Sequence, residues 1–178
     1  MLSLQSRCVR LAAGCLLALC ANARADEADD VTRLFRTGQT EQAFAGLDRL
    51  LAAQPKDAKL RFLKGVMQSD SLRTDEAVAT FRQLNEDYPD LPEPYNNLAV
   101  IYAGRGDYPQ ARSALEAALT ANPAYAVAHQ NMAEVLLQLA RQSYAKAAQL
   151  DPGNSGVATR LAQLRQLGLP AANPVAAP

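Results

Sequence analysis

Two asparagines, Asn97 and Asn131, each directly precede an apolar residue, Leu98 or Met132, and their separation is one that recurs elsewhere in the chain. A side-chain amide both donates and accepts hydrogen bonds, so it can pair with the backbone of an extended peptide whatever the peptide's side chains. The pair therefore predicts a peptide-binding surface. The alternative is that each amide bonds only to neighbouring backbone, and at the same separation before Asn97 the chain has Leu63 instead of a third amide.

Further side chains are expected beside these two amides. Some of them would belong to the core and not to the binding surface. The predicted apolar strip contains Phe62, Leu63, Val66, Val100, Val127 and Leu137, and the predicted polar contacts are Glu93, Asn96, Gln130, Glu134 and Gln138.

Catalysis and metal binding are not predicted, because the residues that they need are missing from the sequence. His129 is the only histidine, and Cys8, Cys15 and Cys20 all lie within positions 1–25. We find no glycine-rich phosphate loop, no metal-ligand spacing and no nucleophile motif. The sequence therefore predicts a non-enzymatic protein without cofactor or metal, in which His129 packs at a helix interface.

The composition favours a helical fold that binds neither nucleic acid nor an anionic membrane surface. The chain has 178 residues, of which 49% are apolar and only 6% aromatic, and it is rich in Ala, Leu, Gln, Arg and Glu. Its 18 Lys and Arg residues equal its 18 Asp and Glu residues. No basic excess therefore points to a polyanionic partner.

Positions 1–25 have the pattern of a secretory signal peptide. Arg7 and Arg10 precede an apolar stretch, and Ala23 and Ala25 form a small-residue cleavage site. Cleavage there would leave a mature chain that begins at Asp26. The apolar stretch of about ten residues is too short to span a membrane, which takes roughly 20. Lipid attachment at Cys15 is a less favoured alternative.

An internal repeat of about 34 residues organises the rest of the chain. Three residue types recur at this spacing: Pro55, Pro89 and Pro123; Ala43, Ala77 and Ala111; Leu47, Phe81 and Leu115. Apolar residues at helical spacing within each unit predict two amphipathic helices joined by a short turn. The turn of the third unit contains Gly104, Gly106 and Asp107, whereas the second unit has Leu72 where a glycine is expected.

These units resemble the tetratricopeptide repeat, and "PEPYNNLAVIYAGRGDYPQARSALEAALTANP" follows its pattern most closely. The resemblance implies an all-α helix-turn-helix solenoid whose first helices line a surface for peptides or protein segments. The predicted solenoid covers residues 26–169, with repeats at about 26–57, 58–91 and 92–125.

The fourth unit, at residues 126–154, is truncated: Tyr144 follows Leu115 by less than one repeat length, and no glycine or proline occurs between Ala126 and Leu150. We therefore predict one long helix in place of a hairpin. A capping helix is expected at 155–168, and a disordered Ala/Pro tail at 170–178. The projecting half of the long helix is a candidate surface for a partner or for a homodimer.

The predicted function is that of a protein-binding adaptor or chaperone-like scaffold, exported to a bacterial periplasm. The bacterial origin is implied by the resemblance alone. Two alternatives stay open: a fixed subunit of an envelope machine for pili, secretion or cytochrome maturation, and a docking accessory of an envelope enzyme.

Overall fold

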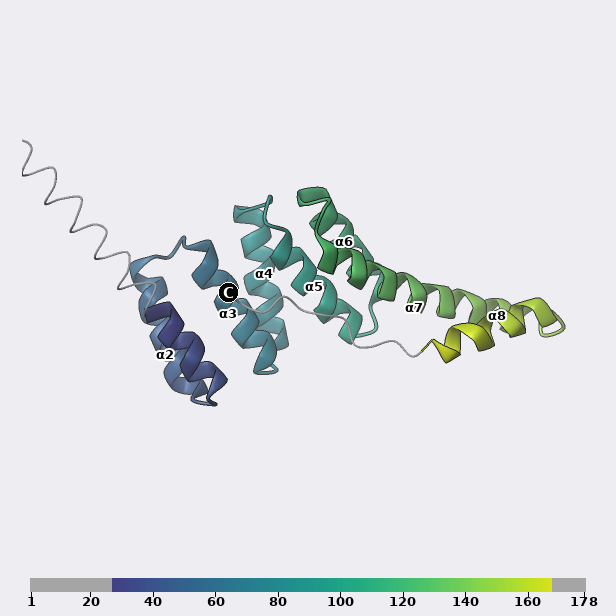
Figure 1. The fold of residues 1–178 in the computed structure, drawn as a ribbon, viewed down its shortest axis with the longest axis horizontal. Coiled ribbons are helices and arrows are strands. Elements are labelled where there is room, and N and C mark those ends of the chain that lie inside the picture. Colours follow the sequence, from purple (N-terminus) through teal and green to yellow (C-terminus); the bar gives the residue numbers. More distant parts are fainter. Residues whose placement is uncertain (1–26, 168–178) are drawn as a thin grey trace, which may run out of the picture. The chain divides into compact units, whose positions relative to one another are not determined.

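The computed structural model describes residues 27–167, which form helices joined by turns (Figure 1). The predicted signal peptide and the Ala/Pro tail lie outside these residues. The chain divides into two compact units, one up to Arg61 and one from Phe62 onward, and the boundary lies within α3. Among the described residues, no helix is both long enough and apolar enough to cross a membrane.

The first unit consists of a helix at residues 27–36 followed by α2, Thr40–Ala53. Apolar residues of both helices meet between them, including Val31, Leu47 and Leu50, which are all buried. Phe35 and Phe44 pack edge to face, with ring centroids 6.4 Å apart. These contacts confirm an antiparallel pair for the first repeat.

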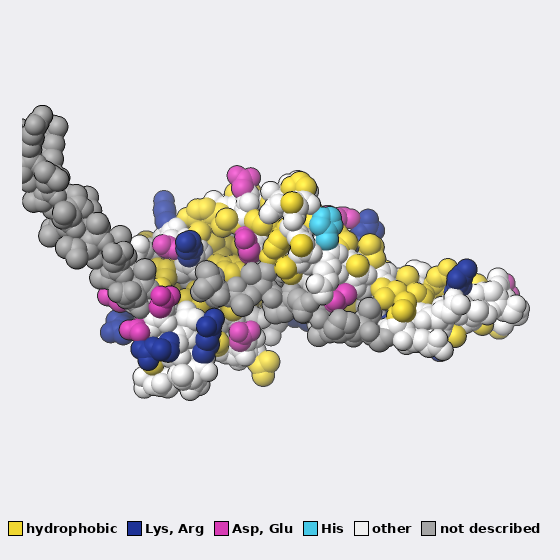
Figure 2. All heavy atoms as spheres, viewed as in Figure 1, with side chains coloured by type: hydrophobic (Ala, Val, Ile, Leu, Met, Phe, Trp, Pro, Cys, Tyr) yellow, Lys and Arg dark blue, Asp and Glu magenta, His cyan; other side chains and the backbone are white. Residues whose placement is uncertain are grey.

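The second unit contains the rest of α3 (Ala58–Asp70), α4 (Thr74–Asp87), α5 (Pro92–Gly104), α6 (Tyr108–Ala121), α7 (Ala126–Leu150) and α8 (Ser155–Gln166). Successive helices pack on one another from α4 to α8, and α5 also contacts α7. Hydrophobic side chains reach the surface along the end that α7 and α8 form (Figure 2). The all-α repeat fold is thus confirmed.

The recurring small and large residues form the core of each helix pair. Ala77, Phe81, Ala111 and Leu115 are fully buried. Phe81 lies so close to α3 that a Cβ built on Gly65 would be 2.5 Å from its Cε1 atom. Only glycine therefore fits at position 65 without a shift of the aromatic ring.

The turns between paired helices share one backbone geometry. Gly38, Leu72 and Gly106, each one repeat length apart, have φ angles of +81°, +61° and +77°. After each of them, the next residue donates its N–H to a carbonyl in the last turn of the preceding helix, as Arg73 does to Gln68. This is a helix C-terminal motif that favours glycine at the left-handed position. Leu72 adopts the same conformation. Because it is 88% exposed, little packing of its side chain offsets the strain.

We expect Leu72→Gly to raise the stability of the second unit by about 0.5–1 kcal/mol. The left-handed conformation costs an L-residue roughly 1–2 kcal/mol, and glycine avoids this cost. Part of the gain is lost, because glycine gives the unfolded chain more conformational freedom. Thermal unfolding followed by circular dichroism measures the change. Leu72→Ala is the control, because it removes the exposed side chain but keeps the strain. Equal effects of the two variants would contradict this explanation.

The truncated fourth unit is one helix, α7, of 25 residues. Its first half packs on α5 and α6, and α8 packs on its second half (Figure 1). The side chain of Asn154 caps α8 by accepting a hydrogen bond from the N–H of Val157. Arg141 of α7 donates to the carbonyls of Leu164 and Leu167, at 2.6 and 2.5 Å. The long helix and the capping helix are therefore both confirmed.

Candidate functional site

The asparagines expected to bind a peptide are buried in the second unit. Asn96, Asn97 and Asn131 are 0%, 4% and 1% exposed. The Nδ2 of Asn97 donates to the Glu93 carbonyl of its own helix at 3.0 Å, and the Nδ2 of Asn131 donates to Asn96 Oδ1 at 2.8 Å. Contrary to the predicted position on a binding surface, Asn97 bonds within α5, and Asn131 joins α7 to α5.

Three residues of the predicted apolar strip belong to the core. Phe62, Leu63 and Val66 are buried in the part of α3 that lies in the second unit. The ring of Phe62 packs against that of Phe81, with centroids 5.7 Å apart. All three are therefore core residues and do not lie on an open binding surface, contrary to the prediction.

Four of the predicted residues that stay accessible define what we call the α5–α7 surface: Val100, Gln130, Glu134 and Gln138. Val100 and Glu134 have equivalent positions in successive repeats. Gln130 is equivalent to buried Asn96, yet it is exposed. The difference arises because α7 contacts α5, whereas no first helix of a further repeat covers α7 within the described residues.

Glu134 has a buried carboxylate oxygen, Oε2, without a hydrogen-bond partner among the described residues. A buried acceptor of this kind is uncommon in proteins. Polar neighbours on the surface are Gln130 and Gln138, and Gln138 accepts a hydrogen bond from Arg141 at 3.4 Å. This oxygen is therefore an unsatisfied acceptor beside the α5–α7 surface.

Tyr125 is a polar residue that sequence reasoning missed. Its hydroxyl is buried without a hydrogen-bond partner in the described chain. Burial, together with the negative charge of Glu93, raises the pKa of Tyr125 to about 12. The hydroxyl therefore stays protonated and keeps its ability to donate. The only sequence signal for this residue was a tyrosine directly before a predicted helix, at a position where the preceding repeat has Leu91.

A second missed feature is a buried polar network between α3 and α4. Gln68 is buried, accepts from the Thr80 hydroxyl at 2.7 Å, and donates to Glu76 at 3.3 Å. A hydrogen bond from Arg73 lowers the pKa of the Glu76 carboxyl. Because its groups bond to one another, this network holds the helices together and is not a site.

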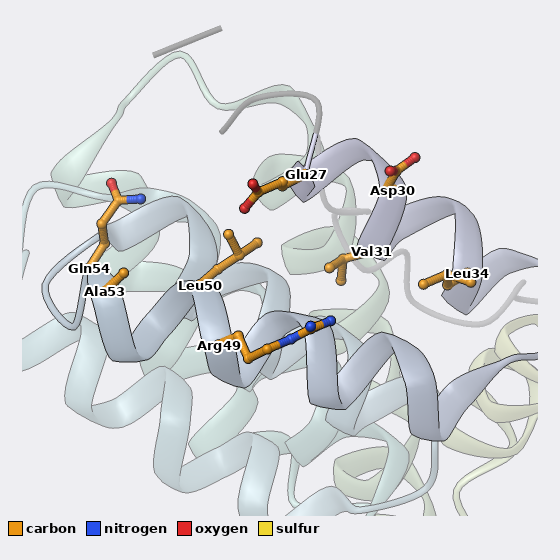
Figure 3. Close-up of a pocket in the computed structure, with 9 residues that line it drawn as sticks. Glu27, Asp30, Val31, Leu34, Arg49, Leu50, Ala53 and Gln54 are labelled. Atoms are coloured by element: carbon orange, nitrogen blue, oxygen red, sulfur yellow. The ribbon is translucent and has the colours of Figure 1, made fainter. Parts of the chain in front are cut away.

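A pocket of about 480 Å³ lies in the first unit, between the helix at residues 27–36 and α2 (Figure 3). Val31 and Leu50 form its apolar floor, while Glu27 and Asp30 lie on one helix and Arg49 on the other. Gly46 approaches Val31 so closely that an added Cβ would be 2.9 Å from its Cγ2. The lining contains no histidine, cysteine or serine.

His129 does not pack as expected. It is exposed, and its Nε2 lies 2.9 Å from the Pro123 carbonyl oxygen. The predicted packing at a helix interface was wrong, because no second helix of the described chain covers this side of α7. Within residues 27–167, no group of His, Asp or Glu is arranged to hold a metal ion.

Comparisons with known proteins agree with the repeat structure. Sequence profiles of the tetratricopeptide repeat match residues 61–91 and residues 92–125. A search of curated proteins found no match to this sequence.

Solved structures share the fold at low sequence identity. PilF of Pseudomonas aeruginosa is similar over 82% of this chain and 69% of its own, with a TM-score of 0.59 and 22% identity. The MamA protein is similar over 82% of both chains, with a TM-score of 0.58 and 16% identity.

A chain in the structure of Naa15/Naa10 bound to HypK-THB is also similar, with a TM-score of 0.56 and 18% identity. The match covers 82% of the present chain but only 23% of that one. Residues 61–125 therefore consist of two tetratricopeptide repeats in tandem, within a helical fold that these solved structures share.

Proposed function

We propose that this protein is a scaffold of a bacterial cell envelope that binds a partner protein segment on the α5–α7 surface. Tetratricopeptide repeats are protein-binding modules, which supports the general function. The pattern of residues 1–25 supports export to the periplasm.

The observation that favours this surface is the buried, unpartnered Oε2 of Glu134. Leaving a buried acceptor unpaired costs about 1–3 kcal/mol, and more when the group is charged. A partner that donates an N–H or a cationic group to Glu134 would remove this cost. Gln130 and Gln138 lie one helical turn on either side and can pair with the partner's backbone. We therefore expect a segment that offers hydrogen-bond donors.

Glu134→Gln is expected to weaken partner binding by about tenfold or more, since hydrogen bonds to charged groups contribute roughly 1.5–3 kcal/mol. The partner would first be recovered from an envelope extract with the tagged protein, and its affinity then measured by calorimetry. The matched control is Glu116→Gln, at an exposed position of α6. It makes the same Glu-to-Gln change in a side chain that already forms an i,i+4 ion pair with Arg112. Equal affinities of wild type and Glu134→Gln would rule out this surface.

The recovered proteins would also distinguish the forms that such a scaffold can take. Many unrelated clients would indicate a chaperone-like role. One stoichiometric partner would indicate a fixed subunit of an assembly machine, and a known enzyme would indicate a docking accessory.

A further inference from the structure

Along the first half of α7, one side of the helix has no other helix of residues 27–167 over it. We call it the uncovered α7 face, and it contains Ala126, His129, Ala133, Leu136, Leu137 and Ala140. The first four are exposed and the last two are half-buried. Their spacing of three and four residues places them on a single side of the helix. Leu136 is 46% exposed, which is unusual for a leucine inside a packed repeat.

The repeat register explains why no helix of the described chain covers this face. Ala133 is equivalent to Ala99 of α5 and Gly65 of α3. Ala99 is buried, and α5 packs against α6, the second helix of its own repeat. Gly65 approaches Phe81 of α4 in the same way. The fourth repeat has no second helix that folds back, since α7 continues to Leu150.

The same side of α7 does bind a helix further along. In the second half of α7, Tyr144 and Ala147 are half-buried where α8 packs on it. α8 ends at Gln166, close to Arg141, whose guanidinium group donates to the carbonyls of Leu164 and Leu167. The first three turns of α7, about 16 Å of helix, therefore extend beyond the end of α8.

We propose that the uncovered α7 face binds the same face of a second copy of this chain, with the two α7 helices antiparallel about a two-fold axis near Ala133. In such a dimer each face meets an identical face. A charged side chain near the two-fold axis would therefore be repelled by the same side chain of the second copy. The face contains no Asp, Glu, Lys or Arg: Glu134 is the only such residue between Ala126 and Ala140, and it belongs to the α5–α7 surface.

The residue sizes also suit two helices in contact. Ala126, Ala133 and Ala140 recur at heptad spacing, and small side chains let helix backbones approach closely. Leu136 and Leu137 flank this row and would lose exposed apolar surface on pairing. The uncovered α7 face occupies only part of one helix, so it would bury less than the roughly 800 Å² per partner that is usual in a stable interface. The dimer should therefore be weak and depend on protein concentration.

Sedimentation velocity of the full chain from about 1 µM to about 1 mM tests the proposal, a range that covers weak affinities. We expect a reversible monomer–dimer equilibrium. Ala133→Glu and Ala133→Lys should each weaken the dimer by more than about tenfold, because like charges then meet at the axis. An equimolar mixture of these two variants should recover a dimer, because opposite charges then pair.

Leu150→Glu is the control for nonspecific association. Leu150 is 74% exposed on the same helix but lies outside the uncovered face, so this variant should dimerise like the wild type. A wild type that stays monomeric throughout the range would overturn the proposal, as would a dimer that Ala133→Glu leaves unchanged. Dimerisation that appears only after removal of residues 168–178 would mean that the chain's own C-terminus covers the face, and would overturn it too.

Discussion

Phe81→Ala is expected to lower the free energy of unfolding of the second unit by about 3–5 kcal/mol, the usual cost of truncating a buried aromatic residue. Phe81 is fully buried, packs on Phe62 and fills the space above Gly65. Domains have only about 5–15 kcal/mol of stability, so the variant should be close to unfolding at physiological temperature. Urea unfolding followed by circular dichroism measures the loss. A loss below about 1 kcal/mol would contradict the described packing.

The chain itself suggests a compensating pair of substitutions at this contact. Gly65 faces Phe81 in the second repeat, whereas the equivalent residues of the third repeat are Ala99 and Leu115. Gly65→Ala alone should cost about 1–2 kcal/mol, because the new Cβ overlaps the Phe81 ring. Combined with Phe81→Leu, it should cost less than the sum of the single changes. Additive losses would mean that the two side chains do not limit each other.

Asn131→Ala is expected to lower the stability of the second unit by about 1–3 kcal/mol, because Asn96 loses a buried hydrogen-bond donor. Asn131 Nδ2 lies 2.8 Å from Asn96 Oδ1, and both side chains are buried. Thermal unfolding gives the loss. This result would separate the observed structural role from the peptide-binding role that the spacing of Asn97 and Asn131 predicts, since a binding amide on the surface could be removed without loss of stability.

Gln130→Ala is the matched control for this experiment. Gln130 precedes Asn131 on the same helix but is exposed. Its removal should change the stability by less than about 0.5 kcal/mol, as surface substitutions usually do. If the two variants unfolded alike, the hydrogen bond between Asn96 and Asn131 would have no measurable part in holding α5 and α7 together.

Much of the helical architecture is predictable because its causes are local and repeated. Small residues such as Ala77 and Ala111, which recur once in every repeat, set the register of the helix pairs. The absence of glycine and proline between Ala126 and Leu150 predicted a continuous helix, since nothing in that stretch ends one. The cap of α8 also has a local cause, because Asn154 directly precedes the helix and asparagine is a favoured capping residue.

The candidate site was less predictable, because burial depends on what the next helix covers. Asn96 and Gln130 have equivalent positions, but α7 packs on α5 and hides only the first of them. Likewise, Asn97 turned out to bond to a carbonyl of its own helix, a contact that sequence spacing does not distinguish from a ligand contact. The unpartnered oxygens of Tyr125 and Glu134 depend on tertiary packing, which the repeat spacing does not show.

The continuous α7 helix also makes the end of the second unit a mechanical lever. Its 25 residues span about 37 Å, so a rotation of about 5° around its N-terminal end would displace Leu150 by roughly 3 Å. Arg141 fastens α8 to this helix, so both would move as one body. A partner that slightly changes how α7 crosses α5 would thereby send a larger displacement to the far end of the unit.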